Sequence, residues 1–289
     1  MKSTLEARLR RRSWQPQRPR WRLRPLHFLE AFMIIFGFLY IYPALFVLMS
    51  ALKPDAEIML KPLALPSKLF LDNFIKAWKV MEFPRVVATT FLISAAGVAG
   101  IVLTSSMAAW MLARTEKRYS WLIYSLFAFA LVIPFQIIMV PLAVLASDLH
   151  LTNPAGIVVL YWGLGAPMAV FMYHGFIKGV PRELEESAAI DGAGTSYIFF
   201  RIVFPLLKPI TATIAILDAL WIWNDFLLPL LVIKQGTIQL AQMQFYGQFL
   251  KEYGPLTASL VLSATPIIIF YLSLQKYIIK GIAAGAVKG

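Results

Sequence analysis

Residues 178–209 read KGVPRELEESAAIDGAGTSYIFFRIVFPLLKP, a polar and small-residue segment inside a very apolar chain. Its acidic residues, between Glu183 and Glu186, complement the positive end of a helix dipole. The Asp-Gly pair that ends at Gly192 is a turn signal. The segment therefore predicts a helix, a turn and a second helix that ends near Pro205.

The rest of the chain has the composition of a membrane protein. Of its 289 residues, 59% are hydrophobic and 15% are charged, whereas soluble domains have about 45–50% and about 25%. A helix needs about 20 apolar residues to cross a bilayer. We expect an all-α membrane protein with six transmembrane helices. The stretches that qualify are 28–51, 86–113, 121–146, 154–177, 209–233 and 256–279.

The basic residues predict which side of the membrane each connection faces. Most of the 27 lysines and arginines fall in one set of alternating segments. These segments are 1–26, 114–120, 178–208 and 276–289. By the positive-inside rule this set is cytoplasmic, and both termini with it. Residues 1–26 are then a basic cytoplasmic arm drawn to anionic lipid, with no nucleic-acid partner expected, and residues 27–289 form the transmembrane domain.

Several kinds of chemistry find no residues to support them. The chain has no cysteine, and its three histidines lack metal-ligand spacing, so we expect no metal site. No nucleophile–base constellation is present, and we predict no catalytic residues and no enzyme activity. The sequence also lacks the G-x-x-x-x-G-K-[ST] loop that binds nucleotide phosphates. We expect no cofactor here, and any ATP is used by a partner protein.

The first predicted helix of the polar segment has a face of small side chains. Leu184, Ser187, Ala188 and Asp191 follow the spacing i, i+3, i+4, i+7, which places them on one side of a helix. A narrow face of this kind suits a groove on another protein. Taken alone, however, the segment could also be an ordinary loop at the membrane surface.

The residue pattern resembles the Glu-Ala-Ala (EAA) motif of ABC importer permeases. In that motif Glu-Ala-Ala is followed three residues later by a glycine, and then by a spaced hydrophobic helix and a proline. Here Ser187 replaces the first alanine, one small residue for another. The resemblance implies that residues 178–208 form the loop that couples the permease to an ATPase. The coupling residues carried over are Glu186, Ser187, Ala188, Asp191, Gly192, Ala193 and Pro205.

Other stretches resemble the carbohydrate-uptake branch of the family, in particular its maltose-type second permease. They are LDNF (71–74), SSMAAWMLAR (105–114), IPFQIIMVPL (133–142), WNDFLLPLLV (223–232) and GIAAGAVKG (281–289). The resemblance implies the type I (MetI-like) architecture in a bacterial or archaeal plasma membrane. It also implies a second homologous permease, two cytoplasmic ABC ATPase subunits, an extracytoplasmic solute-binding protein and a sugar as substrate.

The fifth apolar stretch contains ionisable residues, which are costly inside a membrane and are functional candidates there. Asp218, Trp221 and Asp225 fall on one helical face. Together with Asn224 they are candidates to line a sugar path, because carboxylates bind hydroxyls and an indole stacks on a sugar ring. The alternative is that the acids pair with a neighbouring helix and the indoles mark the membrane interface.

Two other functions remain open from the sequence. An ABC permease for a solute other than a sugar would keep the same motif. A self-contained secondary transporter would usually show more spans or an inverted repeat, and neither is present.

Overall fold

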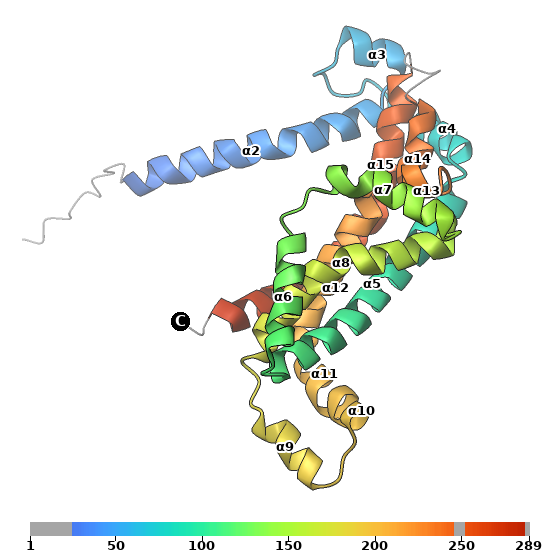
Figure 1. Cartoon of the computed structure of the whole chain (residues 1–289). Coiled ribbons are helices and arrows are strands. Elements are labelled where there is room, and N and C mark those ends of the chain that lie inside the picture. The colour runs from blue at the N-terminus through green and yellow to red at the C-terminus, as the bar shows by residue number, and fades with distance from the viewer. Residues whose placement is uncertain (1–24, 246–251, 287–289) are drawn as a thin grey trace, which may run out of the picture. The chain divides into compact units, whose positions relative to one another are not determined.

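A computed structural model describes residues 25–245 and 252–286, and within these ranges the chain is mostly helical, without a strand (Figure 1). The chain divides into two compact units, residues 1–46 and 47–289. Most of the predicted basic arm, residues 1–24, lies outside the described residues. So do the last three residues of the resembling stretch 281–289.

The described part of the first unit is a single apolar helix. It belongs to α2 (Pro25–Ala51), which has Pro43 in its interior and continues into the second unit. Phe28–Ala51 is long and apolar enough to cross a membrane, as expected for the first span.

The second unit contains the remaining helices, and several of them are short. They are α3 (Asp55–Leu60), α4 (Asp72–Val80), α5 (Phe83–Arg114), α6 (Arg118–Ala130), α7 (Phe135–Asp148), α8 (Pro154–Ile177), α9 (Glu183–Ile190), α10 (Thr195–Tyr197), the π-helix η1 (Ile198–Val203), α11 (Phe204–Leu206), α12 (Lys208–Asn224), α13 (Leu227–Val232), α14 (Ile238–Gln242), the 3₁₀-helix η2 (Met243–Phe245) and α15 (Tyr253–Ala286).

Four helices of the described chain qualify as single membrane spans, in α2, α5, α8 and α15, and the count rises to six if two bent pairs each form one span. The first pair is α6 with α7, bent by 106°. The second joins residues 195–206 to α12 and is bent by 78°. The upper count equals the six predicted spans in number, but the second pair covers residues 195–224 and only overlaps the predicted stretch 209–233.

Two of the predicted spans are interrupted. The stretch 121–146 breaks before Pro134, which is extended at the start of α7 (φ −62°, ψ 136°). Proline lacks an N–H and disfavours helical geometry in the residue before it, which explains the break. The stretch 209–233 breaks at Asp225, whose backbone is extended (φ −71°, ψ 130°). The Asp225 carboxylate accepts a hydrogen bond from the Leu227 N–H at 3.0 Å, which favours a new helix at α13.

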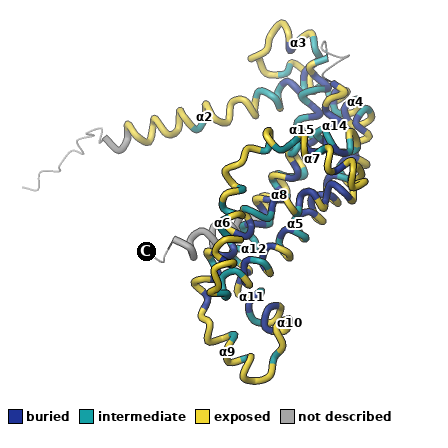
Figure 2. The backbone as a smooth tube through the Cα atoms, in the orientation of Figure 1, coloured by how far each residue is buried: buried dark blue, intermediate teal, exposed yellow. Residues whose placement is uncertain are grey.

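The main core lies where α5, α8 and α12 pack side by side (Figure 2). The lack of a side chain at Gly100 permits close helix packing there, because the indole of Trp162 lies against it. A Cβ at Gly100 would be 1.9 Å from Trp162 Nε1, and that nitrogen donates to the Ala96 carbonyl at 3.0 Å. Glycine is therefore required at this contact.

A second core cluster lies at the end of the unit formed by α3, α4 and α14, and includes Phe83, Trp223 and Ile238. Asn73, from the LDNF stretch, is buried there and donates to the carbonyls of Ala51 (3.0 Å) and Lys53 (2.7 Å). It thereby satisfies carbonyls at the C-terminus of α2, which have no partner within the helix. The connection between α2 and α5 thus contains two short helices, α3 and α4.

The connections gather at two opposite ends of the second unit. The helices α3, α4 and α14 lie at one end, and α9 with α10 and α11 lies at the other (Figure 1). The long helix α5 runs between the two ends. Within the described second unit, the connections 114–120 and 178–208 thus lie at one end and the connection 51–85 at the other.

Candidate functional site

The EAA-like segment folds as predicted into a helix, a turn and further helical turns. The helix α9 ends in a Schellman motif, in which the Ala193 N–H donates to the Ala188 carbonyl at 2.9 Å and the Gly192 N–H donates to the Ala189 carbonyl at 3.1 Å. Gly192 has φ +86°, a conformation that favours glycine. The spacing of Gly192 and Ala193 after the motif's Glu186 thus has a local structural reason.

The second half of the segment anchors the first to the main core. In η1, the side chains of Ile198, Phe199 and Val203 are buried in the main core. The π-helical geometry of these residues was not predicted, and π-turns are frequent at functional sites. Pro205 lies in α11, within the first turn, where proline is tolerated.

A carboxylate next to the motif attaches α9 to the end of α5. Glu185 accepts hydrogen bonds from Trp110 Nε1 (2.9 Å), Arg114 Nε (2.9 Å) and Arg114 Nη2 (2.7 Å). Arg114 Nη2 also donates to the Val180 carbonyl at 3.0 Å. The Arg114 and Glu185 side chains are only 15% and 12% exposed. Because the pair is shielded from water, it fixes the angle at which α9 leaves the bundle.

Sequence reasoning singled out Glu186 and missed Glu185. A signal was present, since Trp110 and Arg114 both belong to the resembling stretch 105–114. Their partner lies more than 70 residues away along the chain, so the contact could not be deduced from local spacing.

The predicted small-residue face of α9 is divided between two environments. Ala188 is half-buried and packs against the main core, as does Ala193. Glu186, Ser187 and Asp191 are exposed, and Ile190 is 86% exposed (Figure 2). The surface that α9 offers to a partner is therefore made by Glu186, Ser187 and Ile190. Ala188 packs on the opposite side, against the main core.

The candidate path residues of α12 do not all share one face. Asp218 is 5% exposed, and its Oδ2 has no hydrogen-bond partner among the described residues. Trp221 is 39% exposed. Asn224 is exposed and donates to the Leu220 carbonyl at 2.8 Å, one turn back in the same helix. Asp225 lies after the helix ends, so the expectation of a continuous helical face that includes it is wrong.

Tyr161 of α8 brings two of these residues together. Its hydroxyl donates to Asp225 Oδ2 at 2.9 Å, and its ring meets the Trp221 ring edge to face with centroids 5.4 Å apart. Tyr161 is fully buried. The Asp225 carboxylate therefore has a partner on a neighbouring helix, as the alternative interpretation requires, whereas Asp218 Oδ2 has none in the described chain.

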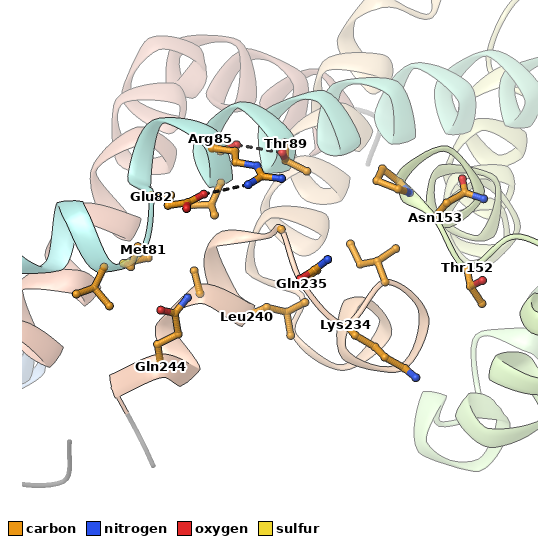
Figure 3. A pocket seen from close by; sticks show the side chains of 16 residues that line it. Met81, Glu82, Arg85, Thr89, Thr152, Asn153, Lys234, Gln235, Leu240 and Gln244 are labelled. Atoms are coloured by element: carbon orange, nitrogen blue, oxygen red, sulfur yellow. Dashed lines mark hydrogen bonds and ion pairs between the residues drawn. The ribbon is translucent and has the colours of Figure 1, made fainter. Parts of the chain in front are cut away.

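A polar cavity of about 670 Å³ lies at the end of the unit opposite α9 (Figures 1 and 3). Figure 3 shows side chains from the start of α5, from the loop before α8 and from the loop before α14 around it. Its size is typical of a ligand pocket. The polar side chains are Glu82, Arg85, Thr89, Thr152, Asn153, Lys234, Gln235 and Gln244.

The backbone around this cavity is held in uncommon conformations. Glu82 (φ +49°) and Lys234 (φ +61°) line the cavity, and His150 (φ +56°) lies two residues before Thr152. Residues other than glycine seldom adopt positive φ, and such strain concentrates at functional positions. The cavity is therefore a second candidate site, one that the sequence did not reveal.

Comparison with known proteins places the chain in a family. The family described as "Binding-protein-dependent transport system inner membrane component" matches residues 100–284, which include the whole EAA-like segment. The chain is 37% identical over 258 residues to the "Probable starch degradation products transport system permease protein AmyC" of Thermoanaerobacterium thermosulfurigenes, covering 88% of this chain and 94% of the relative.

Two further relatives have names of the same kind. Identity is 37% over 259 residues to the multiple sugar-binding transport system permease protein MsmG of Streptococcus mutans, with 87% and 93% of the two chains covered. The sequence identity is 35% over 229 residues to the melibiose/raffinose/stachyose import permease protein MelC of Bacillus subtilis, and the match covers 78% of this chain and 83% of the relative.

The fold is also similar to solved structures. A chain of a bacterial ABC transporter involved in the import of the polysaccharide alginate superposes with a TM-score of 0.72 at 22% identity, covering 87% of this chain and 96% of that chain. The MetNI methionine ABC transporter gives a TM-score of 0.50 at 17% identity, covering 73% and 97%. The chain thus has the MetI-like permease fold, and it belongs to the inner-membrane components of binding-protein-dependent transport systems, within their carbohydrate-uptake branch.

Proposed function

We propose that this chain is the transmembrane permease subunit of an ATP-driven importer for a sugar or oligosaccharide. It forms half of the translocation pore with a second homologous permease. Two ABC ATPase subunits bind on the cytoplasmic side and an extracytoplasmic solute-binding protein delivers the sugar. The matched relatives named for starch products, multiple sugars and raffinose-type sugars support an oligosaccharide as the substrate class.

The observation that carries the proposal is the geometry of α9. The helix is short, has a glycine-dependent end at Gly192, and is attached to α5 through Glu185. Its outward surface combines the charged Glu186 with the small Ser187 and the apolar Ile190, which is 86% exposed. An exposed apolar side chain on a firmly attached helix suits a groove on a soluble partner. A force applied to α9 would pass directly to the membrane helix α5.

The two ends of the unit then face different compartments. In the orientation that the basic residues favour, residues 178–208 and both termini are cytoplasmic, and the polar cavity opens on the outer side. The amides and hydroxyls around that cavity, such as Asn153 and Gln235, can bind sugar hydroxyls or the polar rim of the solute-binding protein. Between the ends, Asp218, Trp221, Asn224 and Asp225 are the candidates for the sugar path.

The test uses two apolar side chains of similar exposure at opposite ends of the unit. Ile190→Glu adds a charge to the outward surface of α9, and Leu65→Glu, at a position 76% exposed, makes the same kind of change in the loop after α3. In the assembled importer, Ile190→Glu should reduce both the ATPase retained on the tagged permease and the ATP hydrolysis stimulated by sugar-loaded binding protein. Leu65→Glu should leave ATPase retention unchanged. Wild-type retention and stimulation in Ile190→Glu would overturn the assignment of α9.

A second measurement distinguishes an ATP-driven importer subunit from a self-contained secondary transporter. The purified single chain, reconstituted without partners, should move no sugar when a proton or sodium gradient is applied. Gradient-driven uptake by the single chain would favour the secondary transporter.

A further inference from the structure

A smaller cavity lies at the same end of the second unit as α9, and Lys178, the first residue of the coupling loop, is the one loop residue in its lining. Its volume is about 420 Å³, and it is formed by the end of α5, the start of α6 and the end of α8. It contains polar and aromatic side chains together, and the coupling mechanism uses none of them. The side chains that matter for its chemistry are Glu116, Lys117, Trp121, Tyr124, His174 and Lys178.

The cavity carries an excess of positive charge. Lys117 and Lys178 line it from two different helix ends, and neither forms an ion pair within the described residues. The one acidic residue in the lining, Glu116, is already paired, because Arg182 Nη1 donates to Glu116 Oε1 at 3.0 Å. An anion that enters the cavity therefore meets two lysines without an ion-pair partner and an acid whose charge is offset, although Lys117 Nζ also lies 6.0 Å from the centroid of the Tyr119 ring.

The backbone adds to this charge. The helix α6 has 13 residues and begins at Arg118, directly after Lys117, and no side chain caps its N-terminus. The first N–H groups of a helix point outward and carry the positive end of the helix dipole, which favours bound anions such as phosphate. Both the side chains and the start of α6 thus favour negative charge in the same place.

A buried histidine in the lining lacks a hydrogen-bond partner. His174 is 6% exposed and stacks on the Tyr124 ring with centroids 3.9 Å apart. No hydrogen bond to its imidazole ring exists within the part of the chain that the structure describes. The ring belongs to the cavity lining, so its nitrogens are available to hydrogen-bond to a polar group inside the cavity.

The side of the cavity that α6 forms is suited to an acyl chain. The lining continues along α6 from Trp121 through Tyr124 to Ala128, two turns into the apolar helix. On the same helix Leu122 and Leu126 are 55% and 60% exposed, as expected of a face in contact with lipid. Trp and Tyr near the end of a membrane helix are typical of the interface layer. The occupant is therefore charged at one end and apolar at the other.

We propose that this cavity is a binding site for an anionic phospholipid. Its phosphate lies between Lys117, Lys178 and the N-terminus of α6, and a headgroup oxygen hydrogen-bonds to His174. Its acyl chains follow the exposed face of α6. The site requires only that this end of the bundle lies at a membrane surface, so it does not depend on which solute is transported.

The experiment titrates lipids against the purified full-length permease in detergent and measures retained lipid by native mass spectrometry. The wild type should prefer phosphatidylglycerol to phosphatidylcholine. Lys117→Gln with Lys178→Gln should weaken phosphatidylglycerol binding about 25-fold, since a lysine near anionic lipid contributes about 1 kcal/mol, or fivefold. The matched control is Lys68→Gln with Lys234→Gln, a pair of exposed lysines at the opposite end, which should leave the preference intact.

The remaining outcomes also decide the proposal. If the double variant keeps the wild-type preference, the site is elsewhere and the proposal is wrong. If inorganic phosphate at millimolar concentration displaces phosphatidylglycerol completely, the cavity binds a soluble anion and not a lipid, which also overturns it. Should the double variant misfold, Lys178→Gln alone is the test, because this exposed residue follows the last turn of α8 and its loss should still weaken binding about fivefold.

Discussion

Arg114, the last residue of α5, and Glu185, in the first turn of α9, form an ion pair with Nη2 and Oε1 2.7 Å apart and with both side chains largely shielded from water. The same carboxylate accepts a hydrogen bond from Trp110. The contact joins a membrane helix to the helix assigned to ATPase docking.

Removal of one partner of this pair should be costly. Glu185→Ala leaves the Arg114 guanidinium buried without its partner, which typically costs about 3 kcal/mol. Glu116→Ala is the matched control, because its pair with Arg182 is exposed (46% and 81%) and such pairs contribute less than about 1 kcal/mol. Thermal unfolding of the purified permease measures both. Equal shifts in the two variants would show that the Arg114–Glu185 pair has no special structural weight.

Because Gly192 has a positive φ, replacing it should strain the backbone without causing a steric clash. A Cβ there would meet nothing within 4 Å, and the same is true of Gly194, which has φ −72°. Gly192→Val should destabilise the end of α9 by about 1–3 kcal/mol and reduce the ATPase retained on the permease. Gly194→Val should be much milder. If both variants retain ATPase equally, the left-handed turn is not needed for docking.

Two buried tyrosines of α8 provide a matched pair for the sugar path. Tyr161→Phe removes the hydrogen bond to Asp225 and keeps the ring against Trp221, whereas Tyr173→Phe removes a hydrogen bond to Thr211 at 2.9 Å. Each should cost about 1 kcal/mol of stability. If Asp225 and Trp221 line the path, Tyr161→Phe should lower ATP-driven sugar uptake more than Tyr173→Phe. Equal uptake in the two variants would assign Tyr161 to packing alone.

Replacement of Asp218 should affect sugar transport without lowering the stability of the complex. Its Oδ2 is buried without a partner in the described chain, so Asp218→Asn should not lower the melting temperature of the complex. If the carboxylate serves the sugar, uptake should nonetheless fall while the assembled complex still hydrolyses ATP. A variant with unchanged uptake would remove Asp218 from the path, and a complex that fails to assemble would indicate a structural role.

The orientation can be tested with single cysteines, because the chain has none of its own. Lys68→Cys and Gln235→Cys, both exposed at the end opposite α9, should react with an impermeant thiol reagent in sealed cells. Glu116→Cys, at a side chain 81% exposed, should react only after permeabilisation. The reverse pattern would invert the topology and place α9 outside, where no ATPase could reach it.

The fold class and the helix–turn geometry of residues 183–193 could be predicted because their signals are local. Apolar runs of membrane length identify most spans, and the spacing from Glu186 to Gly192 encodes a helix followed by a left-handed turn. The breaks near Pro134 and at Asp225 were harder to predict. Proline occurs inside unbroken helices of this chain as well, at Pro43 and Pro167, so its presence alone does not locate a break.

The contacts that complete the sites could not be predicted, because each joins distant parts of the chain. Glu185 lies 71 residues from Arg114, and Asp225 lies 64 residues from Tyr161. Nothing in the local pattern distinguishes Glu185 from its neighbour Glu186, although one is buried and the other is exposed. The positive φ of Glu82 and Lys234 is likewise imposed by packing and not by residue type.

The indole of Trp162 in the notch at Gly100 has a mechanical consequence. The Trp162 side chain of α8 fills the space that Gly100 leaves on α5. A shift of one helix along the other by one residue, a rise of about 1.5 Å, would therefore bring the indole into a steric clash. We therefore expect α5 and α8 to move as one rigid body in any conformational change of the subunit. Any bending then falls where the chain is already broken: near Pro134, at Leu207 between residues 195–206 and α12, and at Asp225.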